Sequence, residues 1–148
     1  MQRYEIVVGD ILSHPKVQEM RNYKHHASID CLEHSLYVSK TAYKVAGKLN
    51  LDAKSVARGA LLHDFYLYDW HVEGSHEGLH GFNHAALALE NATAYFELNP
   101  LERDIIEKHM WPLNLRFPSY VESYIVMVVD KYCTVMETLN LFIRRSIK

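Results

Sequence analysis

The sequence Ala60-Leu61-Leu62-His63-Asp64 sets an imidazole and a carboxylate directly after two leucines. The residues before the pair recur at the spacing of one buried helix face, so the pair is expected near the end of an apolar helix. Burying a charged group costs free energy unless the group is paired or binds a metal. One His-Asp pair is weak evidence for a metal site. The interpretation depends on which other residues the chain directs at it.

Composition indicates a single soluble globular domain over residues 1–148, with 49% hydrophobic and 23% charged residues. The net charge of -2 predicts that neither a nucleic-acid polymer nor a membrane is a partner. Only two cysteines occur, Cys31 and Cys133, which favours a reducing, cytoplasmic setting without a disulfide framework. We expect no signal peptide, and the longest apolar run, 125–129, is too short to span a bilayer. The unusual feature is ten histidines.

Hydrophobic periodicity predicts short helices over 4–14 and 17–21, a polar loop over 22–28 and a long helix over about 29–49. Asp52 is the expected N-cap of the next helix, which should run from Ala53 to about Phe65 and carry His63 and Asp64 near its end.

The second half of the chain contains three further helix-start signals. Asn83 reads as an N-cap with His84 in the first turn, and the sequences 99–102 and 119–122 both read as capping boxes. The last helix is expected over about 138–148. No strand pairs are expected. The predicted fold is therefore all-α, a single compact helical bundle with its core at about 29–136.

The segment 66–82 breaks the helical pattern. It combines three glycines with several ionisable side chains, and a loop of this length and composition is usually functional. Its histidines could form a lid that contacts a substrate: His71, His76 and His80.

Five expected helices each carry a histidine or an aspartate on or beside an apolar stripe. These residues are His34, His63, Asp64, His84, His109 and Asp130. A histidine alone in such a place is more often a core residue with one hydrogen bond. Asp130 is different, because it follows five consecutive apolar residues and would be a buried unpaired charge in most folds. Together, neutral imidazoles and carboxylates form the ligand set of zinc, iron and manganese, and helical bundles build such sites from facing helices.

The order His34, His63-Asp64, Asp130 resembles the signature of the HD-domain superfamily of metal-dependent phosphohydrolases. The additional His84 and His109 resemble the ligands of its dinuclear branch, and the resemblance covers about residues 29–136. It implies a compact bundle of at least five helices around a metal site in the core. It also implies two divalent ions as cofactors, with iron, manganese and zinc as the alternatives.

Carried over residue by residue, the resemblance assigns His34, His63, Asp64 and Asp130 to the first metal. Asp64 would bridge to a second metal, whose other ligands would be His84 and His109. The implied reaction is the attack of a metal-activated hydroxide on phosphorus, with Asp64 at its centre.

The sequence also departs from the family pattern. Many relatives continue the paired motif with a glycine and a lysine, whereas Phe65 follows Asp64 here. The branch that hydrolyses cyclic dinucleotides has an adjacent histidine pair where this chain has His109-Met110, so that activity is not expected. Candidates for the cation that binds phosphate are Lys131, Lys108, Arg116 and Lys24. Lys131 is favoured because it follows a proposed ligand. His26 is a candidate substrate contact or proton donor.

The predicted function is metal-dependent hydrolysis of a small phosphorylated molecule, either a phosphomonoester or a phosphodiester, with nucleotides among the candidates. An alternative uses the same six ligands: relatives such as myo-inositol oxygenase hold two irons and activate dioxygen. A third interpretation is a non-catalytic metal-binding module. The apolar C-terminal helix further suggests a homodimer.

Overall fold

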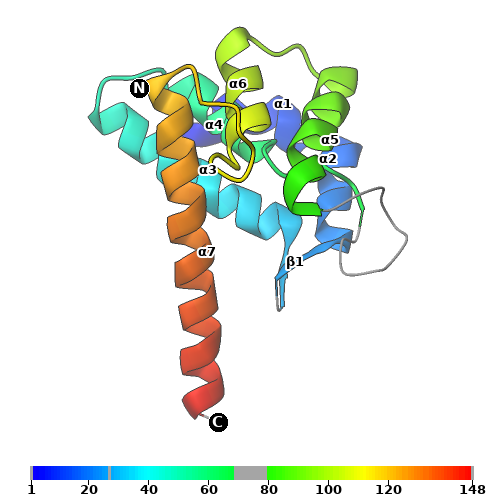
Figure 1. The fold of residues 1–148 in the computed structure, drawn as a ribbon, viewed down its shortest axis with the longest axis vertical. Coiled ribbons are helices and arrows are strands. Elements are labelled where there is room, and N and C mark those ends of the chain that lie inside the picture. Colours follow the sequence, from blue (N-terminus) through cyan, green and yellow to red (C-terminus); the bar gives the residue numbers. More distant parts are fainter. Residues whose placement is uncertain (1, 27, 69–79, 148) are drawn as a thin grey trace.

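The computed structural model describes residues 2–26, 28–68 and 80–147, with only the backbone described at 80–82 and 141–147 (Figure 1). The described elements are α1 (Tyr4–Leu12), α2 (Pro15–Gln18), the 3-10 helix η1 (Glu19–Asn22), β1 (Lys24–His26), β2 (Ile29–Asp30), α3 (Cys31–Lys48), α4 (Ala53–Leu61), α5 (His80–Tyr95), α6 (Pro100–Lys108) and α7 (Val121–Ile147). Of the expected lid, His71, His76 and the side chain of His80 lie outside this description.

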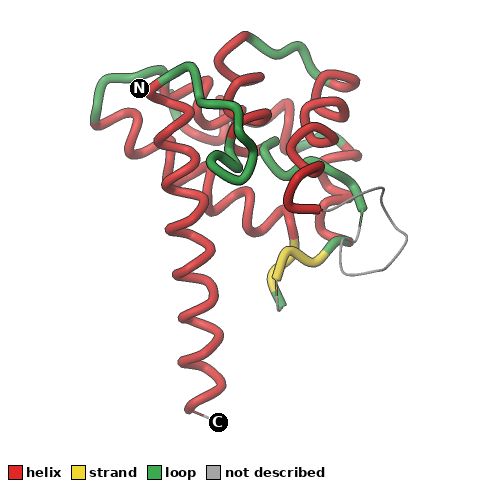
Figure 2. The backbone as a smooth tube through the Cα atoms, in the orientation of Figure 1, coloured by secondary structure: helices red, strands yellow, loops and turns green. Residues whose placement is uncertain are grey.

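The predicted all-α fold is confirmed, and the only strands in the described residues form one short hairpin (Figure 2). Helix α3 packs against α4 and α7, while α6 packs against α4, α5 and α7. The core between them is formed by apolar side chains that include Leu32, Leu61 and Ile105. None of the described helices is long and apolar enough to cross a lipid bilayer.

Side-chain caps define where three of the helices begin. Asp30 and Asp52 accept hydrogen bonds from the backbone N–H groups of Glu33 and Ser55, at 2.8 and 3.0 Å. Asn99 and Glu102 form the predicted reciprocal capping box of α6. Each cap satisfies a backbone donor that has no partner within the helix.

Helix α4 ends earlier than predicted. It stops at Leu61, and the backbone N–H groups of Leu62 and His63 bond to carbonyl groups three residues back, at 3.2 and 3.3 Å. This tighter spacing turns the chain away from the helix axis. His63 and Asp64 therefore lie in the turn after the helix rather than on it.

The polar segment predicted as a loop contains a hairpin instead. Strands β1 and β2 pair in antiparallel fashion, and the N–H of Cys31 donates to the carbonyl of Tyr23 at 2.8 Å. The strands are three and two residues long, too short for the alternation that identifies a strand in a sequence. The hairpin carries His25 and His26 to the start of α3.

Helix α5 begins at His80, so the prediction that Asn83 caps it is wrong. Gly81 made a helix that starts at His80 unexpected from the sequence. A glycine in the first turn lowers helix stability little, because the N–H groups there have no helical partners.

The predicted capping box at Ser119 and Glu122 is also wrong. The Ser119 hydroxyl accepts a hydrogen bond from Lys108, and the Glu122 carboxylate accepts one from the N–H of Asp52. The separate helix expected over 138–148 is the end of α7, which continues because no glycine or proline interrupts it.

Gly59 allows α4 and α6 to approach closely. A Cβ atom at this position would lie 3.0 Å from Cγ2 and 3.1 Å from Cβ of the buried Ile105. Gly59→Val is therefore expected to lower the free energy of unfolding by about 2 kcal/mol, measured by urea denaturation. The matched control is Gly9→Ala, where the added Cβ meets nothing within 4 Å. Equal stability of the Gly59→Val protein and the wild type would contradict this close packing.

Candidate metal centre

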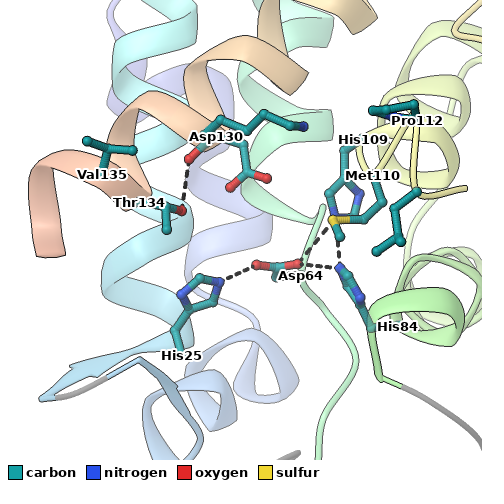
Figure 3. A pocket seen from close by; sticks show the side chains of 11 residues that line it. His25, Asp64, His84, His109, Met110, Pro112, Asp130, Thr134 and Val135 are labelled. Atoms are coloured by element: carbon teal, nitrogen blue, oxygen red, sulfur yellow. Dashed lines mark hydrogen bonds and ion pairs between the residues drawn. The ribbon is translucent and has the colours of Figure 1, made fainter.

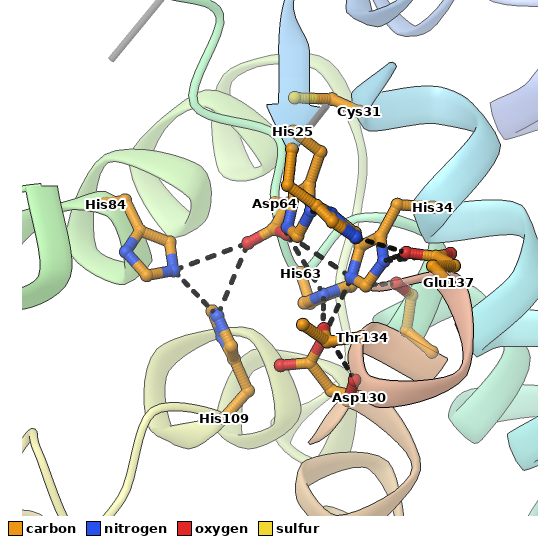
Figure 4. A network of polar contacts seen from close by, with 12 residues as sticks. His25, Cys31, His34, His63, Asp64, His84, His109, Asp130, Thr134 and Glu137 are labelled. Carbon is orange, nitrogen blue, oxygen red and sulfur yellow. Dashed lines mark hydrogen bonds and ion pairs between the residues drawn. The ribbon is translucent and has the colours of Figure 1, made fainter. Parts of the chain in front are cut away.

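The six residues predicted as metal ligands come together in the core (Figure 4). They come from five parts of the chain: His34 from α3, His63 and Asp64 from the turn after α4, His84 from α5, His109 from the C-cap of α6, and Asp130 from α7. All are buried except Asp130, which is partly buried. The bundle therefore gathers residues that are up to 96 positions apart in the sequence.

Four of these residues, His34, His63, Asp64 and Asp130, form what we call the first donor set. Oδ1 of Asp130 lies 2.9 Å from Nε2 of His34 and 3.4 Å from Nε2 of His63. Oδ2 of Asp64 lies 3.8 and 3.3 Å from the same two nitrogens. Each carboxylate thus has an oxygen 2.9–3.8 Å from both imidazole nitrogens.

The second donor set consists of Asp64, His84 and His109. Nε2 of His84 and Nε2 of His109 are 2.9 Å apart, and they lie 3.3 and 3.4 Å from Oδ1 of Asp64. The two carboxylate oxygens of Asp64 therefore face different sets. This is the arrangement of a carboxylate that could bridge two ions.

Backbone hydrogen bonds fix which nitrogen of two histidines is free to bind an ion. Nδ1 of His63 donates to the Ala60 carbonyl at 2.6 Å, and Nδ1 of His109 donates to the Ile106 carbonyl at 2.8 Å. A neutral imidazole has one N–H, so Nε2 of each ring presents a lone pair to the donor sets.

Glu137 orients His34 in a similar way. Nδ1 of His34 donates to the Glu137 carboxylate at 3.0 Å, which directs Nε2 toward Asp64 and Asp130. A carboxylate behind a metal-binding histidine fixes its tautomer and makes the ligand more basic. Glu137 is itself buried, at the far side of the ring from the donor set.

The charges of the cluster attract protons when no cation is present. Burial opposes the charged form of His34, but hydrogen bonds to Asp130 and Glu137 outweigh it and raise its pKa to about 9. Burial likewise opposes a charge on His63, yet the carboxylates of Asp64 and Asp130 raise its pKa well above the usual range. Burial lowers the pKa of His109. The cluster thus combines carboxylate charges with imidazole nitrogens that can bind either a proton or a metal ion.

These residues fit divalent metal ions. An ion with ligands at about 2.1 Å brings the ligand atoms about 3.0 Å apart at right angles and about 3.4 Å apart at tetrahedral angles. The separations given above for the two donor sets run from 2.9 to 3.8 Å. Nε2 of His63 is buried and faces two carboxylate oxygens. A lone pair directed at two anionic oxygens is unfavourable unless a proton or a metal ion lies between them.

A cavity of about 670 Å³ opens over the donor sets (Figure 3). Its described lining residues are His25, Asp64, His84, His109, Met110, Pro112, Leu113, Asp130, Lys131, Thr134 and Val135. Lys131 is thus at the cavity. The other candidate cations are elsewhere: Lys108 pairs with Asp104 at 2.7 Å, Arg116 pairs with Glu107, and Lys24 is an exposed residue of β1.

His25, rather than His26, lines the cavity. Nε2 of His25 lies 3.0 Å from Oδ2 of Asp64, and its ring stacks on the His34 ring with centroids 3.7 Å apart. His26 turns instead toward Glu137, with Nε2 3.0 Å from the carboxylate. The two rings remain in contact, with their Nδ1 atoms 3.0 Å apart, and the strand pairing is irregular between Lys24 and His26.

Two contributors differ from the sequence predictions. The pair His25-His26 was expected near the mouth of the site with His26 as the contact, whereas His25 takes that place, and Glu137 was not identified. Glu137 follows Asp130 by seven residues, which places both on one face of α7. That spacing was the available signal.

A comparison with protein families agrees with this geometry. The family model of the HD domain matches residues 31–134, which begin at α3 and end in α7 after Asp130. HD domains form a superfamily of metal-dependent phosphohydrolases that bind divalent metals. No curated protein and no solved structure matches the chain significantly. Because the match covers more than half of the chain and includes all six donor residues, the protein belongs to the HD-domain family.

Proposed function

We propose that this HD-domain protein is a metal-dependent hydrolase of a small phosphorylated molecule. In this proposal His34, His63, Asp64 and Asp130 bind one divalent ion, and Asp64, His84 and His109 bind a second. The observation that carries the proposal is the position of Asp64, whose two oxygens face two separate sets of nitrogen donors. A bridging carboxylate between two ions is a common feature of metal centres that act on phosphate esters.

When bound, two such ions would lower the pKa of water and offset negative charge on a phosphoryl group. The residues of the chain would orient the reaction. His63 and His109 are fixed by their backbone hydrogen bonds, and His34 is fixed by Glu137. Nε2–H of His25 donates to the Asp64 carboxylate at the edge of the cavity and restrains it.

Lys131 is the proposed contact for a phosphoryl oxygen. It lines the cavity one residue after Asp130, and no ion pair involves it among the described residues. In this proposal it takes the place of the lysine that many relatives carry after the paired motif, where this chain continues with Phe65-Tyr66-Leu67-Tyr68. His26 would act indirectly, by holding Glu137.

The test starts with metal content per chain, measured by elemental analysis on protein without a histidine tag. About two equivalents of iron, manganese or zinc are expected, followed by metal-dependent turnover in a panel of phosphomonoesters and phosphodiesters. Dioxygen consumption without phosphoester turnover would favour the di-iron oxygenase. Two bound metals with neither activity would favour a binding module, and absence of metal after reconstitution would overturn the centre itself.

Glu137→Gln tests the support behind the first donor set. Glutamine can still accept the hydrogen bond of His34, but it lacks the negative charge that makes the imidazole more basic. The metal affinity is expected to fall about 10- to 100-fold, measured by competition with a chromophoric chelator. Glu90→Gln, at an exposed position of α5, serves as the control. An unchanged affinity in Glu137→Gln would mean that this carboxylate only anchors the hairpin.

A further inference from the structure

One wall of the cavity is apolar. Met110, Pro112 and Leu113 come from the segment after α6 and form this wall, and Val135 of α7 lines the cavity on the other side of Asp130 from Met110 and Pro112 (Figure 3). Leu113 is 44% exposed and Val135 is 56% exposed, so about half of each side chain is not packed against the rest of the protein. Apolar side chains that line a concave surface above a polar floor are typical of a ligand site.

Apart from ions bound by the donor sets at its floor, the cavity offers little positive charge. Lys131 is the single lysine or arginine among its described lining residues. Arg116 and Lys108, the nearest in sequence to the apolar wall, are paired with Glu107 and Asp104. A diphosphate or triphosphate carries several charges, and sites for such groups present several cations or backbone N–H groups. This cavity suits one phosphoryl group.

We propose, building on the hydrolase function above, that the substrate is a monophosphate ester whose alcohol or phenol part is apolar. The phosphoryl group lies over Asp64 and Asp130, with one oxygen on Lys131. The organic part packs on Met110, Leu113 and Val135. A cavity of about 670 Å³ holds a compact molecule of this kind together with its phosphate.

Two aryl esters separate this proposal from a general phosphatase. The leaving phenols of 4-ethylphenyl phosphate and 4-(carboxymethyl)phenyl phosphate have similar size and acidity but differ by one negative charge. With the metal-loaded protein, kcat/KM is expected to be at least about tenfold higher for the ethyl compound. Equal values for the two esters would overturn the proposal.

Binding of the matching non-hydrolysable analogues provides a readout that does not depend on turnover. Calorimetry with 4-ethylbenzylphosphonate and 4-(carboxymethyl)benzylphosphonate is expected to show the same preference of at least about tenfold. If neither ester is hydrolysed but the ethyl phosphonate still binds more tightly, the proposed reaction fails and the substrate class of the cavity stands. Equal affinities would overturn the substrate class even in an active hydrolase.

A positive charge introduced on the apolar wall completes the test. Leu113→Lys is expected to weaken binding of the ethyl analogue and strengthen binding of the carboxymethyl analogue, which narrows or reverses the preference. Leu115→Lys is the matched control, because Leu115 is two residues further along, is 86% exposed and does not line the cavity. Similar affinities in the two lysine variants would show that the wall does not contact the ligand.

Discussion

Replacing Asp64 by alanine is expected to remove bound metal from both donor sets and to reduce metal-dependent turnover at least about 1000-fold. Asp64 is the one residue common to the two sets, with Oδ2 3.3 Å from His63 and Oδ1 3.3 Å from His84. The remaining histidines would face one carboxylate, Asp130, instead of two. Elemental analysis and steady-state kinetics measure the two effects.

Asp64→Asn refines this experiment, because the amide keeps one oxygen and the shape of the side chain. It is expected to retain one metal at most, since its amide nitrogen cannot bind the second ion. Glu97→Ala, at an exposed position, should retain both the metals and the activity of the wild type. Two metals per chain in Asp64→Ala would show that Asp64 is not a ligand.

Removal of the metals is expected to lower the Tm by about 10 °C at pH 8. A ligand present at a thousand times its Kd stabilises the folded state by about 4 kcal/mol, and each kcal/mol shifts the Tm of a protein of this size by about 2–4 °C. The proposed metal ligands come from five segments of the core, so loss of the ions is expected to loosen contacts across the bundle. Scanning calorimetry of chelated and reconstituted protein measures the difference.

The same difference should grow as the pH rises. In the metal-free protein the pKa of His34 is about 9, above its ordinary value of 6.5, because hydrogen bonds to Asp130 and Glu137 outweigh burial. Its charged form therefore stabilises the fold fully below about pH 6.5, and this contribution is lost as the pH rises through 9. Metal binding changes in the opposite direction, because a proton on His34 competes with the metal below about pH 9.

The expected result is a Tm difference between metal-loaded and metal-free protein that increases from pH 6 to pH 9. Repeating the measurement with Glu137→Gln should reduce the pH dependence of the metal-free protein, since His34 loses one of the three carboxylate charges that raise its pKa. A Tm difference that is constant or decreases over this range would contradict the assignment of His34.

The identities of the clustered residues could be predicted from the sequence because their chemistry is unusual for their surroundings. A carboxylate such as Asp130, which follows five apolar residues, needs a cation or several hydrogen-bond donors in any fold that buries it. The sharing of Asp64 between two nitrogen sets depends on side-chain orientation in the turn after α4. No periodicity encodes that orientation, and the resemblance to a family supplied the expectation of a bridge.

The errors have a common origin in short-range geometry. Choosing between His25 and His26 requires knowing that residues 24–26 are a strand. The end of α4 was placed too late because apolar residues continue past the last helical hydrogen bond. A separate helix over 138–148 was predicted, although no glycine or proline near residue 138 breaks α7. Local backbone geometry decides such positions, and residue type alone does not specify it.

Two turns of helix α7 supply residues to three parts of the site. Asp130 belongs to the first donor set, Lys131 and Val135 line the cavity, and Glu137 lies behind His34. Because the backbone of an α-helix is rigid, a movement of α7 displaces these residues together. Beyond them α7 projects away from the other helices (Figure 1). The part of α7 near the cavity packs on α3 and α6. A partner bound to the projecting end, such as the second copy that the sequence predicts, would therefore move the proposed metal ligand Asp130 and the proposed substrate contacts together.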